Sequence, residues 1–250
     1  QGAAKFYHEN GKHIITVLTE HKAVLDVCEY LEKEGFLLTR LPVNSDGLLD
    51  LNKFEQSIQE ETILVSIMHV NNEIGVIQPI REIGAICKKR GIIFHVDAAQ
   101  SVGKIPVNVN EMGIDLLSIS AHKLYGPKGV GALYMRRKNP RIQLQPIIFG
   151  GGHERGIRSG TLPVSNIVGF GKACKLAIKV MEEESLKIDA LRNQLLEAII
   201  TDNPNVKVNG SMEERVAGNL NISFLGMNNE TIIAAVPEIA LSSGAACTTS

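Results

Sequence analysis

The sequence predicts an α/β fold in which a mainly parallel β-sheet is flanked by helices on both faces. Between residues 13 and 135, short apolar segments rich in Val, Ile and Leu alternate with amphipathic segments. The apolar segments are nearly unbroken, as in TILVSIMHV at 62–70, which indicates strands buried on both faces. Strands that alternate with helices are typical of parallel sheets built from crossover units.

The individual elements follow from the same pattern. Segment 22–34 is predicted as an amphipathic helix because its apolar residues recur at helical spacing, at positions 23, 24, 27, 28 and 31. A helix over about 79–90 begins at Pro79, where the missing N–H costs no hydrogen bond. A short helix is expected at 51–59, and strands are expected at 13–18, 36–41, 62–70, 91–96, 115–120 and 129–135.

The character of the sequence changes after residue 149. FGGGHERGIRSGT at 149–161 is a glycine-rich, basic loop, and residues 165–200 are helical for most of their length. Short strands are expected at 220–224 and 239–242. We therefore expect a large domain over 1–165, followed over 166–250 by an inter-domain helix and part of a smaller α+β domain. Neither end has an obvious terminal element, so we expect a piece of a longer protein that lacks the N-terminal part of the large domain.

Charge and composition exclude several classes of function. The chain has 26 Lys and Arg against 27 Asp and Glu, which gives no electrostatic reason to bind nucleic acid or an anionic membrane. No apolar run approaches the ~18–20 residues of a membrane span, and nothing resembles a secretory signal. The cysteines, Cys28, Cys87, Cys174 and Cys247, are scattered without zinc spacing, so we expect no metal site and a reducing compartment.

Lys123 and Asp97 each lie where a predicted strand ends. A lysine at the end of a strand in an apolar sheet is expected to be substantially desolvated, which lowers its pKa and favours Schiff-base chemistry. The alternative is an ordinary surface lysine. Asp97 ends the strand in FHVDAAQ, where ligands of open α/β sheets bind, and a protonated pyridine nitrogen would be a suitable partner for its carboxylate. The alternative is that Asp97 caps the next element.

Two further strand ends carry polar side chains. Asn71 and Asn72 follow the strand 62–70, and can either form a turn or donate to a ligand oxygen. His21 follows the strand 13–18 and can either begin the next helix or take part in catalysis. His, Asn, Asp and Lys at four neighbouring strand ends would converge on one edge of the sheet. That convergence favours a binding or catalytic site.

Two loops add candidate groups. Cys247 lies in SSGAACTTS, among small residues that are typical of an exposed loop, where a thiol of lowered pKa is a nucleophile. The glycines at 150–152 allow unusual backbone angles and, together with Arg155, Arg158 and Thr161, offer a cradle for a phosphate or carboxylate.

Taken together, these segments resemble the cysteine desulfurases of the NifS/IscS type, which are class V aminotransferase-like enzymes that depend on pyridoxal phosphate. The matching segments are TEHKAVLD (19–26), VNNEIGVIQPI (70–80), HVDAAQSVGK (95–104), SAHKLYGPKGVGALY (120–134), GGGHERGIRSGTLP (150–163) and SSGAAC (242–247). The resemblance implies a fold type I pyridoxal-phosphate-dependent transferase. The surroundings of the cysteine resemble the group of the family that has a mobile catalytic loop.

The resemblance implies a role for each candidate residue. Lys123 would hold the cofactor covalently and move protons at the substrate Cα. Asp97 would pair with the pyridine nitrogen, and Gln100 and Asn72 would bind the ring hydroxyl. His21 would stack on the ring and assist acid–base steps.

The remaining implied roles concern the phosphate and the sulfur. Ser120 and His122 would bind the cofactor phosphate, and Thr161 would reach the phosphate of a neighbouring subunit, which implies a homodimer. Cys247 would attack the sulfur of L-cysteine, leaving a persulfide and releasing alanine. By analogy with the family, the persulfide would pass to an iron–sulfur scaffold protein or to a sulfur carrier for tRNA thiolation, in the cytoplasm or the mitochondrial matrix.

Some features of the family are absent, and other functions stay open. Relatives carry a Ser-Gly-Ala-Thr-type phosphate loop before the position of Gln1 and a substrate-binding arginine beyond the catalytic cysteine, and this sequence contains neither. The alternatives are a selenocysteine lyase or related aminotransferase, for which Cys247 would be dispensable, and a truncated relative without catalytic activity.

Overall fold

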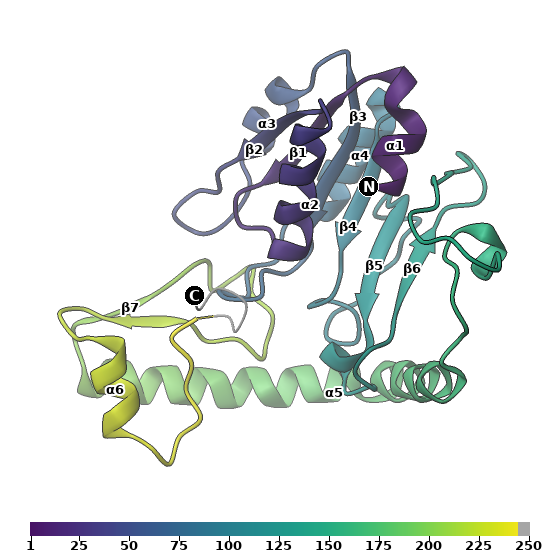
Figure 1. The fold of residues 1–250 in the computed structure, drawn as a ribbon. Helices are drawn as coiled ribbons and strands as arrows, with labels where there is room; N and C mark the ends of the chain where they lie inside the picture. The colour runs from purple at the N-terminus through teal and green to yellow at the C-terminus, as the bar shows by residue number, and fades with distance from the viewer. Residues whose placement is uncertain (245–250) are drawn as a thin grey trace.

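The central element is a six-stranded sheet with the strand order β2-β1-β3-β4-β5-β6. The structure is a computed structural model that describes residues 1–244 (Figure 1). The strands are β1 (His13–Val17), β2 (Leu37–Leu41), β3 (Thr62–Met68), β4 (Ile93–Asp97), β5 (Leu116–Ser120) and β6 (Gly131–Met135). All neighbours pair in parallel except β6, which is antiparallel to β5. The predicted, mainly parallel sheet is therefore confirmed, and each of these strands lies within about two residues of its predicted bounds.

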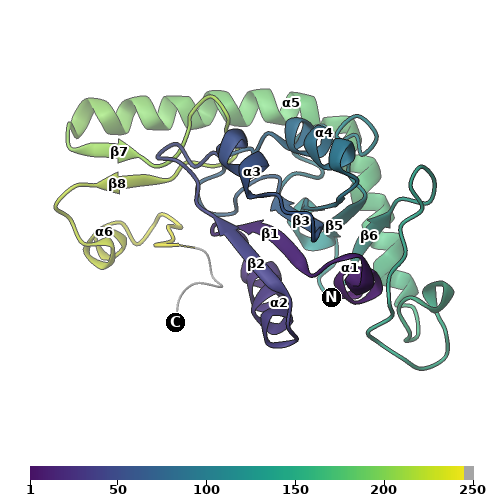
Figure 2. The ribbon, with the colours of Figure 1, turned by 90° about the horizontal axis from the view of Figure 1, so that it is seen from above.

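Helices cover both faces of this sheet, as Figure 2 shows from above. On one face lie α3 (Leu51–Ser57) and α4 (Ile80–Arg90), and on the other lie α1 (Gly2–Tyr7) and α2 (Lys22–Lys33). The side chains of β3 alternate between the two faces, and all are buried: Val65 packs in the cluster that contains Phe54 of α3, and Leu64 packs in the one that contains Leu31 of α2. An unbroken apolar strand is the sequence that this two-sided burial requires.

The helix α5 (Val164–Asp202) is 39 residues long and runs past the edge of the sheet where β5 ends (Figure 1). Its Phe170 and Ala173 pack on Ala121 and Leu124 of the short 3-10 helix η2 (Ala121–Leu124), which follows β5 directly. This apolar contact fixes the segment after β5 against α5.

Beyond α5, the chain forms a separate two-stranded ladder of β7 (Val206–Val208) and β8 (Ile222–Phe224), followed by α6 (Asn229–Ala235). The strand expected at 239–242 is wrong. Ile239 and Leu241 are exposed, and within residues 1–244 this segment pairs with no other strand. Instead, β8 pairs with β7, a strand that was not predicted from the sequence.

Two further short 3-10 helices are η1 (His8–Asn10) and η3 (Glu154–Gly156). In the part of the chain that the structure describes, none of the helices has the length and apolar character that a membrane crossing requires.

Gly84 provides a test of the packing of α4. A Cβ atom at Gly84 would lie 2.0 Å from the carbonyl oxygen of Met112, whereas one at Gly171 in α5 would meet nothing within 4 Å. We expect Gly84→Ala to lower the free energy of unfolding by about 2 kcal/mol or more, because the backbone of α4 or of Met112 must move to make room for the methyl group. The matched change Gly171→Ala should raise it by about 0.5–1 kcal/mol, since alanine is the better helix former. Urea denaturation of both variants measures the difference, and equal effects would contradict this packing.

Candidate active site

Four neighbouring parallel strands end at the same edge of the sheet, and each is followed by a candidate residue. The strands β1, β3, β4 and β5 are adjacent in the sheet order. His21 follows β1, Asn72 follows β3, Asp97 is the last residue of β4, and Lys123 lies in η2 after β5. This edge faces α5 (Figure 1). The predicted convergence of these four strand ends is therefore present in the fold.

A cavity of about 570 Å³ lies between this edge and α5. Asn72, Gln100 and Lys123 line it, so the structure brings these three predicted residues together. The other lining residues include Lys104 and Tyr125 near the sheet, Glu184 and Ile188 of α5, and residues 216–219. The cavity thus combines lysine amines, side-chain amides and the carboxylate of Glu184 with apolar walls, which is the common composition of a small-molecule site.

Lys123 is exposed, so the expectation that it is desolvated at the strand end is wrong. The reason lies in η2. This single 3-10 turn directs Ala121 and Leu124 into the contact with α5, and it leaves His122 and Lys123 facing outward. The amine of Lys123 therefore reaches the cavity from the surface side.

Asp97 lies on the same edge but lines a different depression. Its Oδ1 atom accepts a hydrogen bond of 2.9 Å from the backbone N–H of Ala99, so the capping role considered for Asp97 is present in the structure. The side chain faces a depression of about 1440 Å³ that is also lined by His95 and Ser118. Of these two hollows, the depression therefore contains Asp97 and the cavity contains Lys123.

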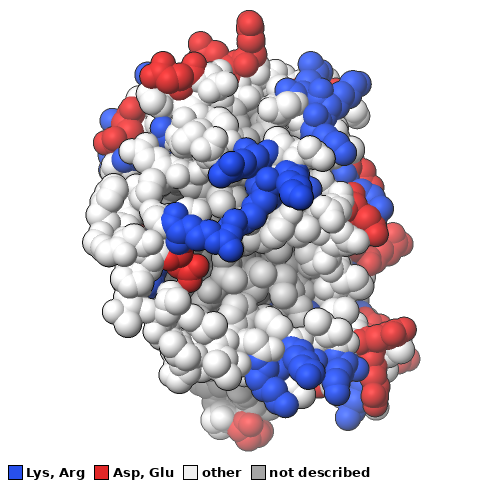
Figure 3. All heavy atoms as spheres, turned by 90° about the vertical axis from the view of Figure 1, so that its right-hand side faces the viewer, with Lys and Arg blue, Asp and Glu red and all other residues white. Residues whose placement is uncertain are grey.

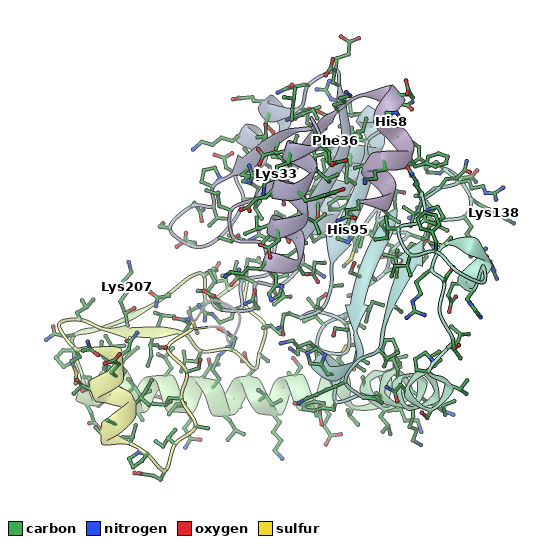
Figure 4. All side chains as sticks on the ribbon, in the orientation of Figure 1. His8, Lys33, Phe36, His95, Lys138 and Lys207 are labelled. Carbon is green, nitrogen blue, oxygen red and sulfur yellow. The ribbon has the colours of Figure 1, made fainter. Side chains whose placement is uncertain are left out.

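His95, labelled in Figure 4, links three strands beside Asp97. Its Nδ1 lies 2.8 Å from Oγ of Ser66 on β3, and its Nε2 lies 2.9 Å from Oγ of Ser118 on β5. Burial lowers the pKa of His95 to about 4, although Asp97 opposes this shift. The imidazole is thus neutral at pH 7. This role could not be predicted from the sequence, because the pairing of the strands and not the spacing along the chain places Ser66 and Ser118 beside His95.

The turns at the ends of β1 and β3 hold the remaining candidates. His21 is the N-cap of α2, where its Nδ1 accepts a hydrogen bond of 3.1 Å from the N–H of Ala23. Asn71 forms a turn by accepting from the N–H groups of Glu73 and Ile74. The predicted alternatives, that His21 begins a helix and that the Asn71 segment forms a turn, are therefore confirmed. Asn72 lies on the cavity wall.

Two predicted phosphate-binding groups lie in different places. Ser120 Oγ and His122 Nδ1 are 2.9 Å apart at the end of β5. Thr161 is exposed in the loop before α5 and lines neither the cavity nor the depression, whereas Arg155 and Arg158 of the same loop line the depression. On the face that Figure 3 shows, Lys and Arg side chains gather in patches.

Cys247 lies outside the described residues. Within residues 1–244, no cluster of three His, Cys, Asp or Glu side chains is placed to hold a metal ion.

Comparison with known proteins identifies the family. All of residues 1–250 match the family described as Aminotransferase class-V. The chain belongs to this family.

Class-V relatives cover the chain almost completely. It is 55% identical over 250 residues to a protein of Dictyostelium discoideum named "Probable cysteine desulfurase, mitochondrial", and 60% identical over 248 residues to "Cysteine desulfurase IscS" of Actinobacillus succinogenes. These matches cover 100% and 99% of the chain but only 55% and 61% of the relatives. The chain therefore spans somewhat more than half the length of these proteins.

Solved structures that are more than 30% identical to the chain have the same fold. A "NIFS-LIKE PROTEIN" aligns with a TM-score of 0.89 and 36% identity over 95% of the chain and 64% of that protein. A structure described as "SspA in complex with cysteine" aligns with a TM-score of 0.81 and 38% identity over 98% of the chain and 67% of that protein. The resemblance drawn from the motifs and the expected fold type I architecture are both confirmed.

One buried acidic residue at this edge of the sheet was not predicted from the sequence. Glu20 is buried after β1, and its Oε1 accepts a hydrogen bond from the N–H of Met68 at the end of β3. Burial and the nearby charge of Asp97 hold the pKa of Glu20 well above its usual 4.5, which favours the protonated form of the carboxyl group. Its Oε2 has no hydrogen-bond partner among the described residues, and neither do Thr19 Oγ1 and His69 Nδ1.

Sequence offers one signal for this residue. The apolar strand 13–18 is followed at once by Thr-Glu-His, and a carboxylate so close to a buried strand end needs a donor or a proton. Three buried polar atoms without partners at the ends of β1 and β3 also mark this edge as a place where further hydrogen-bond partners fit.

Glu20→Gln tests the protonation state of this buried acid. Because the folded-state pKa is raised, the folded protein keeps a proton that the unfolded chain releases above about pH 4.5. The stabilising contribution of Glu20 is therefore complete below that pH and is lost as the pH rises toward the folded-state pKa. The free energy of unfolding of the wild type should fall relative to Glu20→Gln by up to ~1.4 kcal/mol per pH unit in this window.

Urea denaturation between pH 4 and pH 8 measures this difference. Glu29→Gln is the matched control, since Glu29 is exposed on α2, and its free energy of unfolding should run parallel to that of the wild type. Parallel curves for the wild type and Glu20→Gln would mean that Glu20 is ionised in the folded protein.

Proposed function

We propose that this chain carries the catalytic machinery of a pyridoxal-phosphate-dependent cysteine desulfurase, which converts L-cysteine to L-alanine and takes up the sulfur as a persulfide on Cys247. The observation that carries the proposal is the convergence of His21, Asn72, Asp97 and Lys123 on one edge of a parallel sheet. The names of the relatives, which are 55–60% identical to the chain, support the same activity.

The side-chain types at this edge suit pyridoxal phosphate, with Lys123 in the cavity and Asp97 in the depression beside it. An exposed amine, Lys123, suits the carbonyl group of the cofactor, and the carboxylate of Asp97 suits its ring nitrogen. The amides of Asn72 and Gln100 share the cavity with Lys123 and suit the ring hydroxyl. The bonded pair of Ser120 and His122 offers donors to a phosphate.

When bound, the cofactor supplies an electron sink for the bonds of the substrate Cα. The amine of Lys123 then removes and returns the proton at Cα, and the imidazole of His21 assists at the end of α2, where it is already held as the N-cap. Thr161, exposed on its loop, would reach the phosphate of a second subunit in a homodimer.

The sulfur transfer balances without an external oxidant or reductant. The Sγ atom of Cys247 attacks the substrate sulfur, so an S–S bond forms while the substrate C–S bond breaks. The electron pair of the broken bond stays with the carbon fragment, which gains a proton and leaves as alanine. Cys247 retains a persulfide, which an iron–sulfur scaffold protein or a sulfur carrier for tRNA thiolation would accept in the cytoplasm or the mitochondrial matrix.

The proposed domain organisation places the site between two units. Residues 1–165 would form the large cofactor-binding domain. Residues 166–250 would supply the inter-domain helix, which corresponds to most of α5, and part of a smaller domain that carries the cysteine loop. The cavity wall formed by α5 and residues 216–219 supports this division.

Cofactor binding is tested by the visible absorption spectrum of the chain mixed with pyridoxal phosphate. We expect a band from the cofactor joined to Lys123 that shifts when L-cysteine is added. Lys123→Ala should lose this band, because the amine of Lys104, the other lysine on the cavity wall, is engaged in its hydrogen bond to Gln100. Lys128→Ala is the matched control, since Lys128 is also exposed and lines neither the cavity nor the depression; a band lost in both variants, or absent from the wild type, would count against the proposal.

The role of the thiol is tested separately. Cys247→Ala should reduce release of alanine and sulfide from L-cysteine by at least about a hundredfold, since a nucleophile in covalent catalysis cannot be replaced by a methyl group. Cys174→Ala, at a half-buried position of α5, should retain activity. Normal sulfur release by Cys247→Ala would favour a selenocysteine lyase or aminotransferase instead.

A further inference from the structure

Lys104 reaches the candidate site from the turn that follows β4. Its Nζ atom donates a hydrogen bond of 2.7 Å to Oε1 of Gln100, and both side chains are half-buried. Both also line the cavity that contains Lys123. Lys104 therefore contacts Gln100, one of the residues expected to bind the cofactor.

The backbone fixes where Lys104 leaves the turn. The N–H groups of Lys104 and Ile105 both donate to the carbonyl oxygen of Ser101, so residues 101–105 are wound tightly. Gly103 has a φ of +82°, and a Cβ there would lie 3.2 Å from Ala177 of α5 and from Leu124 of η2. The turn is thus packed against both elements that enclose the cavity.

The hydrogen bond determines which way the Gln100 amide faces. An ammonium group has donors and no acceptor, so the amide oxygen must be the atom that faces Lys104. The amide nitrogen, which can only donate, is left for another partner. A fixed Nε2 donor suits an oxygen that carries negative charge, such as the ionised ring hydroxyl of pyridoxal phosphate.

We propose that Lys104 is a positioning residue that holds the Gln100 amide with its nitrogen toward the cofactor, so that Gln100 stabilises the ionised ring oxygen. This inference rests on the proposed function. Without Lys104, the amide is free to turn over and to present its oxygen to the ring oxygen, which is repulsive.

Other charged groups also face Lys104. Lys123 of η2 and Glu184 of α5 line the same cavity, as does the phenol of Tyr125. Burial, and to a smaller extent the charge of Lys123, lowers the pKa of Lys104. A test must therefore separate an effect that passes through Gln100 from a direct effect of charge on Lys123.

A double-mutant cycle in the holoenzyme makes this separation. We expect Lys104→Met to weaken pyridoxal phosphate binding about tenfold, since a charge-assisted hydrogen bond that orients Gln100 is lost. It should also raise the pH at which the visible band titrates, because the ionised ring oxygen loses its donor. In the Gln100→Leu background, Lys104→Met should change neither quantity further. Lys104→Arg retains the donor and the charge, so it should bind the cofactor within about twofold of the wild type.

Each other outcome would overturn the inference. Equal effects of Lys104→Met in both backgrounds would mean that Lys104 acts directly by its charge. No effect in the wild-type background would mean that Gln100 does not depend on Lys104. Thermal unfolding of each variant identifies any loss of the fold, and a wild-type band that Lys123→Ala abolishes shows that the proposed function stands even where the role of Lys104 fails.

Discussion

Parallel hydrogen bonding between β1, β3, β4 and β5 sends four chain segments out of the sheet at one edge. Parallel strands need long connections, so the residues at this edge come from widely separated parts of the sequence. Thr-Glu-His after β1 and Ala-His-Lys after β5 are about a hundred residues apart, yet they meet the same edge. The site depends on this pairing, because no single segment contains enough functional groups to bind a cofactor.

Packing at the same edge then determines which side chains of each segment face the cavity. Buried side chains of η2 rest on Phe170 of α5, and this contact turns Lys123 outward. The turn that carries Gln100 and Lys104 meets the same two elements through Gly103. Thus α5 forms one wall of the cavity and also fixes the positions of the amine and the amide on the opposite wall.

Strand positions follow from the sequence because buried parallel strands need continuous apolar runs, and the segment 62–70 is a clear case. The prediction of a strand at 239–242 failed because a short apolar segment is ambiguous without knowledge of its partner.

The family motifs identified Asn72, Gln100 and Lys123, which share a cavity. They did not predict that Asp97 faces another depression or that Lys123 is exposed, because strand register and the packing of a 3-10 turn are tertiary properties. Glu20 and His95 were missed for the same reason, since each acquires its role from residues on a neighbouring strand.

The pKa shifts of Glu20 and His95, the neighbours of Asp97, bear on how a carboxylate at Asp97 would bind a cofactor. Burial and the charge of Asp97 raise the pKa of Glu20, and burial lowers the pKa of His95 to about 4, so both shifts favour the neutral forms of these two neighbours. A second carboxylate beside Asp97 would compete with it for any cation, and a protonated His95 would satisfy Asp97 before a ligand arrived. Less charge on these neighbours leaves the side chain of Asp97 more available to a ligand. In the proposed function, a carboxylate at this half-buried position would favour the protonated form of the pyridine nitrogen, which is the form that draws electrons from a substrate.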